Sequence, residues 1–134
     1  MAEGKVSFEL VSPERLLLSE EVDMVEVPGE EGDFGVLTRH APLISTLRPG
    51  VIKVHDGGSI TQRIFVAGGF AEVTPARCTV LAEEALPVGE IDRAATEQRL
   101  NDAKDDLLDA KDSIQKTVAE RRIKVAEEML KAAG

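Results

Sequence analysis

The sequence from Val27 to Leu43 reads Val-Pro-Gly-Glu-Glu-Gly-Asp-Phe-Gly-Val-Leu-Thr-Arg-His-Ala-Pro-Leu. It contains three of the chain's eleven glycines and two of its six prolines, grouped around three acidic residues. Glycine adopts backbone angles that other residues resist, and proline fixes its own, so this composition predicts a loop with a defined shape. The stretch holds no nucleophile beside a general base and no cluster of metal ligands. We expect it to present a binding surface rather than to perform chemistry.

The composition of the chain limits the kinds of partner it can bind. Its 134 residues suffice for one domain, or for one small domain with an appendage. A formal net charge of -9 argues against nucleic acid as a partner, since phosphate binding needs clustered Lys and Arg. The longest apolar run, Ile64–Val73, is shorter than the roughly 20 residues that span a bilayer. The N-terminus lacks the apolar core of a signal peptide, so we expect a soluble, unprocessed chain without direct bilayer insertion.

Short apolar segments separated by Gly and Pro predict strands on both sides of the loop. Val6–Leu10 alternates apolar and polar residues with the period of a half-buried strand. Val22–Val27 is also strand-like, with a phase slip that indicates a bulge. The Asp56-Gly57-Gly58 sequence between two apolar segments predicts a β-hairpin. Further predicted strands are Leu16–Leu18, Leu43–Leu47, Val51–Val54, Ser59–Val66, Ala71–Val73 and Cys78–Ala82. The pattern is typical of an antiparallel β-sandwich or a flattened barrel.

The composition changes at Pro87, which predicts a second domain. We place a β-sandwich domain at residues 1–86 and a helical domain at residues 87–134. Two apolar stripes with helical spacing follow, one ending at Ile114 and one beginning at Ala119. The step of five between them breaks the continuous face, and Asp112 and Gln115 stand there at capping-box spacing. We expect a hairpin of two helices; a single helix with a stutter is the alternative.

The charge is distributed unevenly along the chain. Residues 1–89 carry 14 acids and 7 bases, and residues 90–114 carry 8 acids and 4 bases. Residues 115–134 carry 5 bases and 3 acids, so the last helix is the basic part of an acidic protein. An acidic partner for this helix is one interpretation, and a solvated helix face is the other.

The usual signatures of catalysis and metal binding are missing from the sequence. His40 and His55 have no Cys or second His at ligand spacing, which argues against zinc. The Gly68-Gly69 pair lacks the Lys and Ser/Thr of a phosphate-binding loop, and no Gly-x-Ser-x-Gly elbow occurs. We therefore predict that the chain has no catalytic residues, metal or cofactor and is not an enzyme by itself.

The stretch Val27–Leu43, together with the Leu47–Val54 sequence, resembles the epsilon subunit of F-type ATP synthases, whose mitochondrial counterpart is called delta. Phe65–Val73 and Thr79–Ala85 match later family motifs in the expected order. The resemblance covers nearly the whole chain and implies a fold of the α+β class. It implies an N-terminal β-sandwich of about ten strands and a C-terminal helical hairpin.

The resemblance also implies a role in the central stalk of the synthase. The subunit would bind the gamma subunit and touch the ring of c subunits, turning with the rotor on the cytoplasmic face of the membrane without catalysing a reaction. By their position in the motif, Glu31, Gly32 and Asp33 would face the polar loops of the ring. His40, Ala41 and Pro42 would lie at the gamma contact; for His40, a local hydrogen bond within the loop is the alternative.

Two further expectations concern the helical tail. In many relatives the tail inhibits ATP hydrolysis, its basic helix meeting acidic loops of the catalytic beta subunits, and Arg121, Arg122 and Lys124 would make that contact here. Some relatives bind ATP through an Ile/Leu-Asp-x-x-Arg-Ala motif. This chain keeps Asp92 but has Ala95 at the position of the arginine, so we expect no strong nucleotide binding. An unrelated ligand-binding sandwich is the third functional hypothesis, after the rotor subunit and the regulator.

Overall fold

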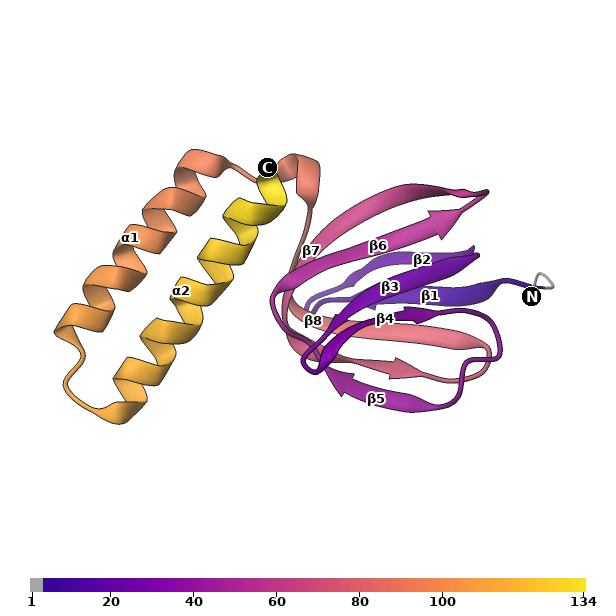
Figure 1. Cartoon of the computed structure of the whole chain (residues 1–134), viewed down its shortest axis with the longest axis horizontal. Coiled ribbons are helices and arrows are strands. Elements are labelled where there is room, and N and C mark those ends of the chain that lie inside the picture. Colours follow the sequence, from indigo (N-terminus) through magenta and orange to yellow (C-terminus); the bar gives the residue numbers. More distant parts are fainter. Residues whose placement is uncertain (1–3) are drawn as a thin grey trace. The chain divides into compact units, whose positions relative to one another are not determined.

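The computed structural model describes residues 4–134 and divides the chain into two compact units (Figure 1). The first unit ends at Pro87, and the second comprises Val88–Gly134. Eight strands make up the described part of the first unit, and two α-helices dominate the second. A sheet followed by a pair of helices confirms the predicted α+β class.

The eight strands form a single bent sheet. Their order is β2-β1-β8-β7-β6-β3-β4, with β5 paired to β7 beside this path. All strand pairs are antiparallel except β1 with β8, which is parallel. The sheet is therefore mixed rather than purely antiparallel. The strands are β1 Val6–Val11, β2 Leu16–Val22, β3 Met24–Gly29, β4 Gly32–Val36, β5 Leu43–Thr46, β6 Gly50–Asp56, β7 Ser59–Val73 and β8 Arg77–Pro87.

The described chain forms eight strands where the resemblance implied about ten, and one predicted interruption is absent because β7 continues through it. The strand is 15 residues long and pairs first with β6 and then with β5, and Figure 1 shows it curving between them. Gly68 and Gly69 lie at the curve with positive φ angles of 74° and 98°. A Cβ atom on Gly69 would lie 1.8 Å from the carbonyl oxygen of Leu81, so only glycine fits there.

The predicted strand Val22–Val27 is wrong as one element, because the chain bends at Asp23 between β2 and β3. The Asp23 carboxylate accepts a hydrogen bond from the Gly57 amide at 2.9 Å and pairs with Lys5 Nζ at 2.9 Å. Lys5 also pairs with Asp56. The hydrogen bonds that Lys5 donates to Asp56 and Asp23 raise the pKa of Lys5 to about 12, and the bond from Lys5 lowers the pKa of Asp23. We call these three side chains the Lys5 cluster.

Most of the loop predicted at Val27–Leu43 is also strand. β3 runs to Gly29 and β4 begins at Gly32, so only Glu30 and Glu31 form the turn of a hairpin. The irregular part is confined to residues 37–42. The loop was predicted because glycine and proline are depleted in strands. In this hairpin they lie where two backbones approach closely.

Aliphatic side chains fill the core of the first unit. Alternate residues of β1 point into it, with Val6 and Phe8 fully buried and Leu10 nearly so. Cys78 belongs to the same cluster, and burial raises the pKa of its thiol to about 12. The thiol is therefore protonated and shielded in the folded unit.

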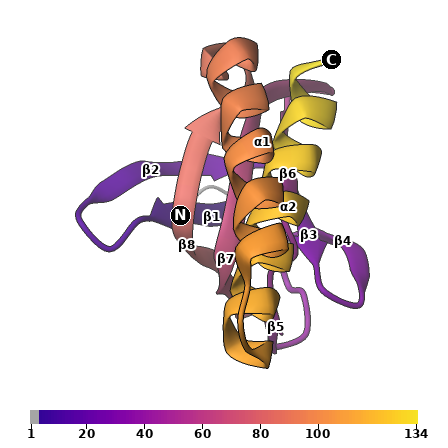
Figure 2. The ribbon, with the colours of Figure 1, turned by 90° about the vertical axis from the view of Figure 1, so that its left-hand side faces the viewer.

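The second unit is a helical hairpin of α1, Arg93–Asp109, and α2, Ser113–Ala133, preceded by the 3-10 helix η1, Val88–Glu90. Figure 2 shows the two helices side by side. Asp112 caps α2 by accepting a hydrogen bond from the Gln115 amide at 2.7 Å. This confirms the predicted hairpin and excludes the continuous helix. Ile114, which was assigned to the first stripe, instead lies in α2 and is 75% exposed.

The hairpin buries mainly small side chains. Its buried residues are Thr96, Ala103, Ala119, Ala126 and Met129. Alanine lets two helices approach closely but removes little apolar area from water, so each contact stabilises the hairpin only slightly. Neither α1 nor α2 is long and apolar enough to cross a membrane.

Candidate functional site

The tip between β3 and β4 carries the acids that the sequence assigns to the ring contact. Gly29 pairs with Gly32 across the turn, and a Cβ atom on Gly29 would lie 2.7 Å from the Gly32 carbonyl oxygen. Glu31, Gly32 and Asp33 are all exposed. The turn therefore presents them on a narrow hairpin whose width only glycine permits.

Two side-chain bonds hold this tip against the next part of the chain. Thr46 donates a hydrogen bond to Glu30, and Arg48 pairs with Asp33. Backbone bonds support them, because the Glu30 amide donates to the Thr46 carbonyl at 2.9 Å. The tip is thus fixed on β5 rather than extended freely into solvent.

The residues assigned to the gamma contact lie in the irregular segment after β4. His40 is partly exposed and its Nδ1 donates a hydrogen bond to the Ala41 carbonyl at 2.7 Å, so the local bond considered for this side chain is present. Arg39 has a positive φ of 65°, and its amide donates to the Pro75 carbonyl at 2.6 Å. That bond anchors the segment to the turn before β8 and leaves Ala41 and Pro42 exposed.

A row of outward-facing apolar residues crosses the same sheet, and no motif in the sequence indicated it. The strand registers place Phe70 opposite Leu81, Leu81 opposite Val11, and Val11 opposite Leu16. Residues directly opposite each other in neighbouring strands share a face of the sheet. We call these four side chains the apolar row.

The apolar row points away from the core. Its sequence neighbours Leu10, Val80 and Ala71 are buried, and side chains alternate between faces along a strand. Phe70 and Leu81 are each 40% exposed and Leu16 is 55% exposed. The signal for this row in the sequence was weak. Adjacent apolar residues, such as Val80-Leu81, break the alternation of apolar and polar residues along a strand. Only the pairing of strands that are distant in the sequence brings the outward-facing ones into a row.

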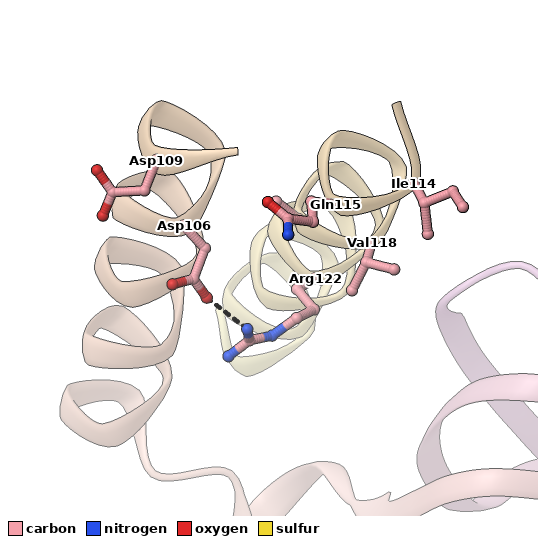
Figure 3. A pocket seen from close by; sticks show the side chains of 7 residues that line it. Asp106, Asp109, Ile114, Gln115, Val118 and Arg122 are labelled. Carbon is pink, nitrogen blue, oxygen red and sulfur yellow. Dashed lines mark hydrogen bonds and ion pairs between the residues drawn. The ribbon is translucent and has the colours of Figure 1, made fainter. Parts of the chain in front are cut away.

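The bases assigned to an inhibitory contact differ in how they are bonded. Arg122 of α2 pairs with Asp106 of α1, as Figure 3 shows. Lys124 Nζ lies 2.9 Å from Glu128, and that interaction lowers the pKa of the Glu128 carboxyl. Within the described residues, Arg121 forms no ion pair. The folded hairpin thus engages two of the three bases in its own ion pairs.

A pocket of about 340 Å³ lies beside the Arg122–Asp106 pair (Figure 3). Ile114 and Val118 of α2 line one part of it and are 75% and 51% exposed. Asp109 from α1 and Gln115 complete the polar wall. This loop end of the hairpin is therefore less well packed than the end that contains Ala126 and Met129.

Asp92, the residue retained from the nucleotide motif, caps α1. Its carboxylate accepts a hydrogen bond from the Ala95 amide at 3.1 Å. The neighbouring Arg93 donates a hydrogen bond to the carbonyl of Gly134 at the end of α2. A positive charge at a helix C-terminus also interacts favourably with the helix dipole. Both side chains therefore have structural partners. Among residues 4–134, no group of three or more His, Cys, Asp or Glu side chains is arranged to hold a metal ion.

Comparison with known proteins agrees with this architecture. Residues 5–88 match the family described as ATP synthase, Delta/Epsilon chain, beta-sandwich domain. The chain is 58% identical to the ATP synthase epsilon chain of Paramagnetospirillum magneticum over 132 residues, which cover 98% of each chain. It is 55% identical to the epsilon chain of Rhodospirillum rubrum over 125 residues, or 93% of each chain.

Solved structures share the fold at lower sequence identity. A chain of the Euglena gracilis mitochondrial ATP synthase, in a structure of OSCP, F1 and the c-ring, aligns with a TM-score of 0.82 and 24% identity. The alignment covers 97% of this chain and 82% of that one. A chain from the central stalk and c-ring of the Tetrahymena thermophila enzyme aligns with a TM-score of 0.69 and 17% identity, covering 97% of both. The sheet, the hairpin and the whole-length identity together establish that the chain belongs to the ATP synthase epsilon chain family.

Proposed function

We propose that this chain is a rotor subunit in the central stalk of an F-type ATP synthase. It couples proton-driven rotation of the c ring to ATP synthesis by binding the gamma subunit, and it catalyses no reaction itself. The observation that carries the proposal is identity above one half to epsilon chains along almost the entire sequence. In this role the chain is peripheral, on the cytoplasmic face of the membrane.

The apolar row supplies the surface for gamma. Contiguous apolar patches of more than about a few hundred Å² are rare on soluble monomers and mark interaction sites. The four apolar side chains lie on four paired strands and none of them lies in a loop. The exposed Ala41 and Pro42, with His40, belong to the segment anchored near the start of β8, and we assign them to the gamma contact as well.

The tip supplies the contact to the ring. Glu31, Gly32 and Asp33 are exposed polar groups suited to the polar loops of a ring subunit. A contact that transmits torque must not bend, and the hairpin ladder with the Arg48–Asp33 and Thr46–Glu30 bonds provides that stiffness. Two glycines inserted after Gly32 should therefore impair proton-driven synthesis more than they impair folding. Normal synthesis by that variant would reduce the tip to a simple turn.

A charge test addresses the gamma surface. Phe70→Asp with Leu81→Asp places two carboxylates at neighbouring positions of the apolar row, where binding would bury them. We expect co-purification with gamma to fall by about 100-fold or more. Ser59→Asp, at the exposed first residue of β7, is the matched control and should bind normally. Undiminished binding by the double variant would contradict the proposed surface.

A second function, inhibition of ATP hydrolysis by the tail, is favoured by Arg121. It is the assigned base without an ion pair in the described hairpin, so it remains available to acidic loops of a beta subunit. Removal of Val88–Gly134 should then raise hydrolysis by the assembled complex, and Arg121→Glu should do so in part. Unchanged hydrolysis in both would remove the inhibitory role and leave the coupling role intact.

The third hypothesis, a ligand-binding sandwich unrelated to the synthase, loses its basis with family membership. The nucleotide site loses support as well, because the Asp92 carboxylate caps a helix and Ala95 offers only its backbone amide to it.

A further inference from the structure

The outer edge of β5 carries hydrogen-bonding groups that point away from the sheet. Leu47, just beyond β5, donates its amide to the Gly69 carbonyl at 3.1 Å, which makes Leu47 and Gly69 a hydrogen-bonded pair. In an antiparallel ladder such pairs alternate with pairs whose main-chain N–H and C=O groups point away from the partner strand. The register of β5 with β7 therefore directs the main-chain groups of Ser45 to β7 and those of Ile44 and Thr46 to the opposite side.

That opposite side is covered along only part of its length. The end of β3 follows it as far as Glu30, whose amide donates to the Thr46 carbonyl. The chain then turns at Glu30 and Glu31 and runs away as β4. Among the strands of the described chain, none pairs with this edge at Ile44, so its amide and carbonyl lie at an open ladder position.

A groove with a volume of about 520 Å³ lies at this position, between β5 and the tip. Its lining includes Glu30, Glu31 and Asp33 and contains no Lys, Arg or His. Glu30 and Asp33 bind Thr46 and Arg48, whereas Glu31 forms no ion pair within the described residues. Ile44 contributes an apolar side chain that is 69% exposed.

The length of the open position is limited at both ends. Toward the C-terminus, Thr46 already bonds to Glu30. Toward the N-terminus, the next outward-facing position is Pro42, which has no amide hydrogen to donate. An incoming strand can therefore pair over about three residues only, which suits a short extended loop and disfavours pairing between long edges.

We propose that a short extended segment of a partner subunit, carrying a Lys or Arg, pairs with the main chain of Ile44. It would continue the pairing along the outer edge of β5 beyond Thr46, where the chain from β3 turns away. The base of the segment meets Glu31, and its neighbouring side chain covers Ile44. Addition of a strand to an open edge takes affinity from the main chain and specificity from the side chains beside it. The proposal rests on the proposed function, since the partner is another rotor subunit of the same complex.

Hydrogen–deuterium exchange tests the pairing directly. Exchange at the Ile44 amide is compared between the isolated chain and the assembled synthase, with fragmentation that resolves single residues across Leu43–Thr46. A backbone bond at this amide should slow its exchange by about tenfold or more. Equal rates in the two states would overturn the proposal, while co-purification with the complex would still support the rotor role.

A pair of variants separates the backbone from the side chain. Ile44→Pro removes the outward amide hydrogen and leaves the bonds of Ser45 to β7 in place, as proline is tolerated at strand edges that face solvent. Ile44→Thr keeps the amide. In reconstitution of synthase depleted of this chain, Ile44→Pro should raise the half-saturating concentration about tenfold, and Ile44→Thr by less than about threefold. Wild-type behaviour of Ile44→Pro would overturn the proposal.

A third variant tests the charge. Glu31→Gln keeps the shape of the tip and removes the acid, so it should weaken the dependence of reconstitution on salt concentration. An unchanged salt dependence would contradict a base at this position. Failure of the wild-type chain to join the complex at all would instead contradict the proposed function.

Discussion

The two units of this chain are stabilised in different ways. The first buries large apolar side chains such as Phe8 and Ile52, which are fully inaccessible to solvent. The second buries chiefly alanine and leaves Leu108 and Ile114 84% and 75% exposed. Since stabilisation scales with buried apolar area, the sheet forms the stiffer body and the hairpin the one that opens more easily.

This difference matches a division of labour. Both surfaces proposed for the rotor, the apolar row and the tip, lie on the stiff unit. The bases proposed for regulation lie on the hairpin, where weak packing and ion pairs give a structure that can change at low cost. The unit proposed to transmit force is thus the more stable one, and the unit proposed to regulate hydrolysis is the less stable one.

The largest expected effect comes from Gly69. Gly69→Ala combines a positive φ with an overlap against the Leu81 carbonyl, so the first unit should lose about 4 kcal/mol or more of unfolding free energy. Gly57→Ala, with a positive φ but open space around it, should lose only about 1 kcal/mol. Urea unfolding followed by labelling of the buried Cys78 thiol reports on this unit. Equal losses would contradict the role assigned to the β7 bend.

Core truncation compares the units directly. Ile52→Ala in the first unit should cost about 3 kcal/mol, because the side chain is fully buried in a large cluster. Leu107→Ala in the hairpin should cost about 1 kcal/mol, because that side chain is partly exposed. Thiol labelling follows the first and helical circular dichroism the second. A larger loss from Leu107→Ala would reverse the assignment of the stiff unit.

The predictions from sequence succeeded where the signal is local. The cap at Asp112 and Gln115 needs only residues three apart, and the helical hairpin followed from it. The Asp56-Gly57-Gly58 turn lies between β6 and β7 as expected. Such features depend on turn chemistry and capping, which neighbouring residues decide.

The failures share a different physical origin. The apolar row exists only through registers that join β2, β1, β8 and β7, so no single segment carries its signal. Glycine usually indicates the end of a strand, but β7 continues through Gly68 and Gly69. The close approach of the Leu81 carbonyl explains why glycine is required at Gly69. Ile114 was assigned to the wrong helix, because an apolar residue in the first turn of a helix need not face its partner.

The pH dependence of the Lys5 cluster adds a further contrast. The raised pKa of Lys5 gives stability that is present below its unfolded value of 10.5 and lost as the pH rises through about 12. The lowered pKa of Asp23 gives stability that is present above 3.8 and lost as the pH falls through its folded value. Thiol labelling would confuse unfolding with ionisation at high pH, so deuterium exchange of core amides is compared with that of Lys5→Met at each pH, which cancels the base catalysis of exchange itself.

Lys5→Met is the control for this dependence. It should remove the alkaline loss from the first unit while leaving the hairpin unchanged. In the hairpin, Lys124 lowers the pKa of Glu128. This interaction stabilises the hairpin above the unfolded pKa of 4.5, and the stabilisation should be lost as the pH falls through the lowered value. An alkaline loss that persists in Lys5→Met would contradict the role of the cluster.

The smallest expected effect is at the exposed ion pair of the hairpin. Arg122→Ala should cost about 0.5 kcal/mol, since exposed ion pairs contribute little to stability. Arg121→Ala, which removes no ion pair, is its matched control and should be neutral. Helical circular dichroism in urea measures both. A loss above about 2 kcal/mol at Arg122 would mean that the hairpin is held by charge rather than by weak packing.

The first unit should join the rotor and transmit torque without the second. The measurement is proton-driven ATP synthesis in a complex whose copy of this chain lacks Val88–Gly134. The truncated chain should co-purify with gamma and the c ring, and synthesis should continue. A truncated chain that folds, as judged by its shielded Cys78 thiol, yet fails to join the rotor or to sustain synthesis would refute this role of the first unit.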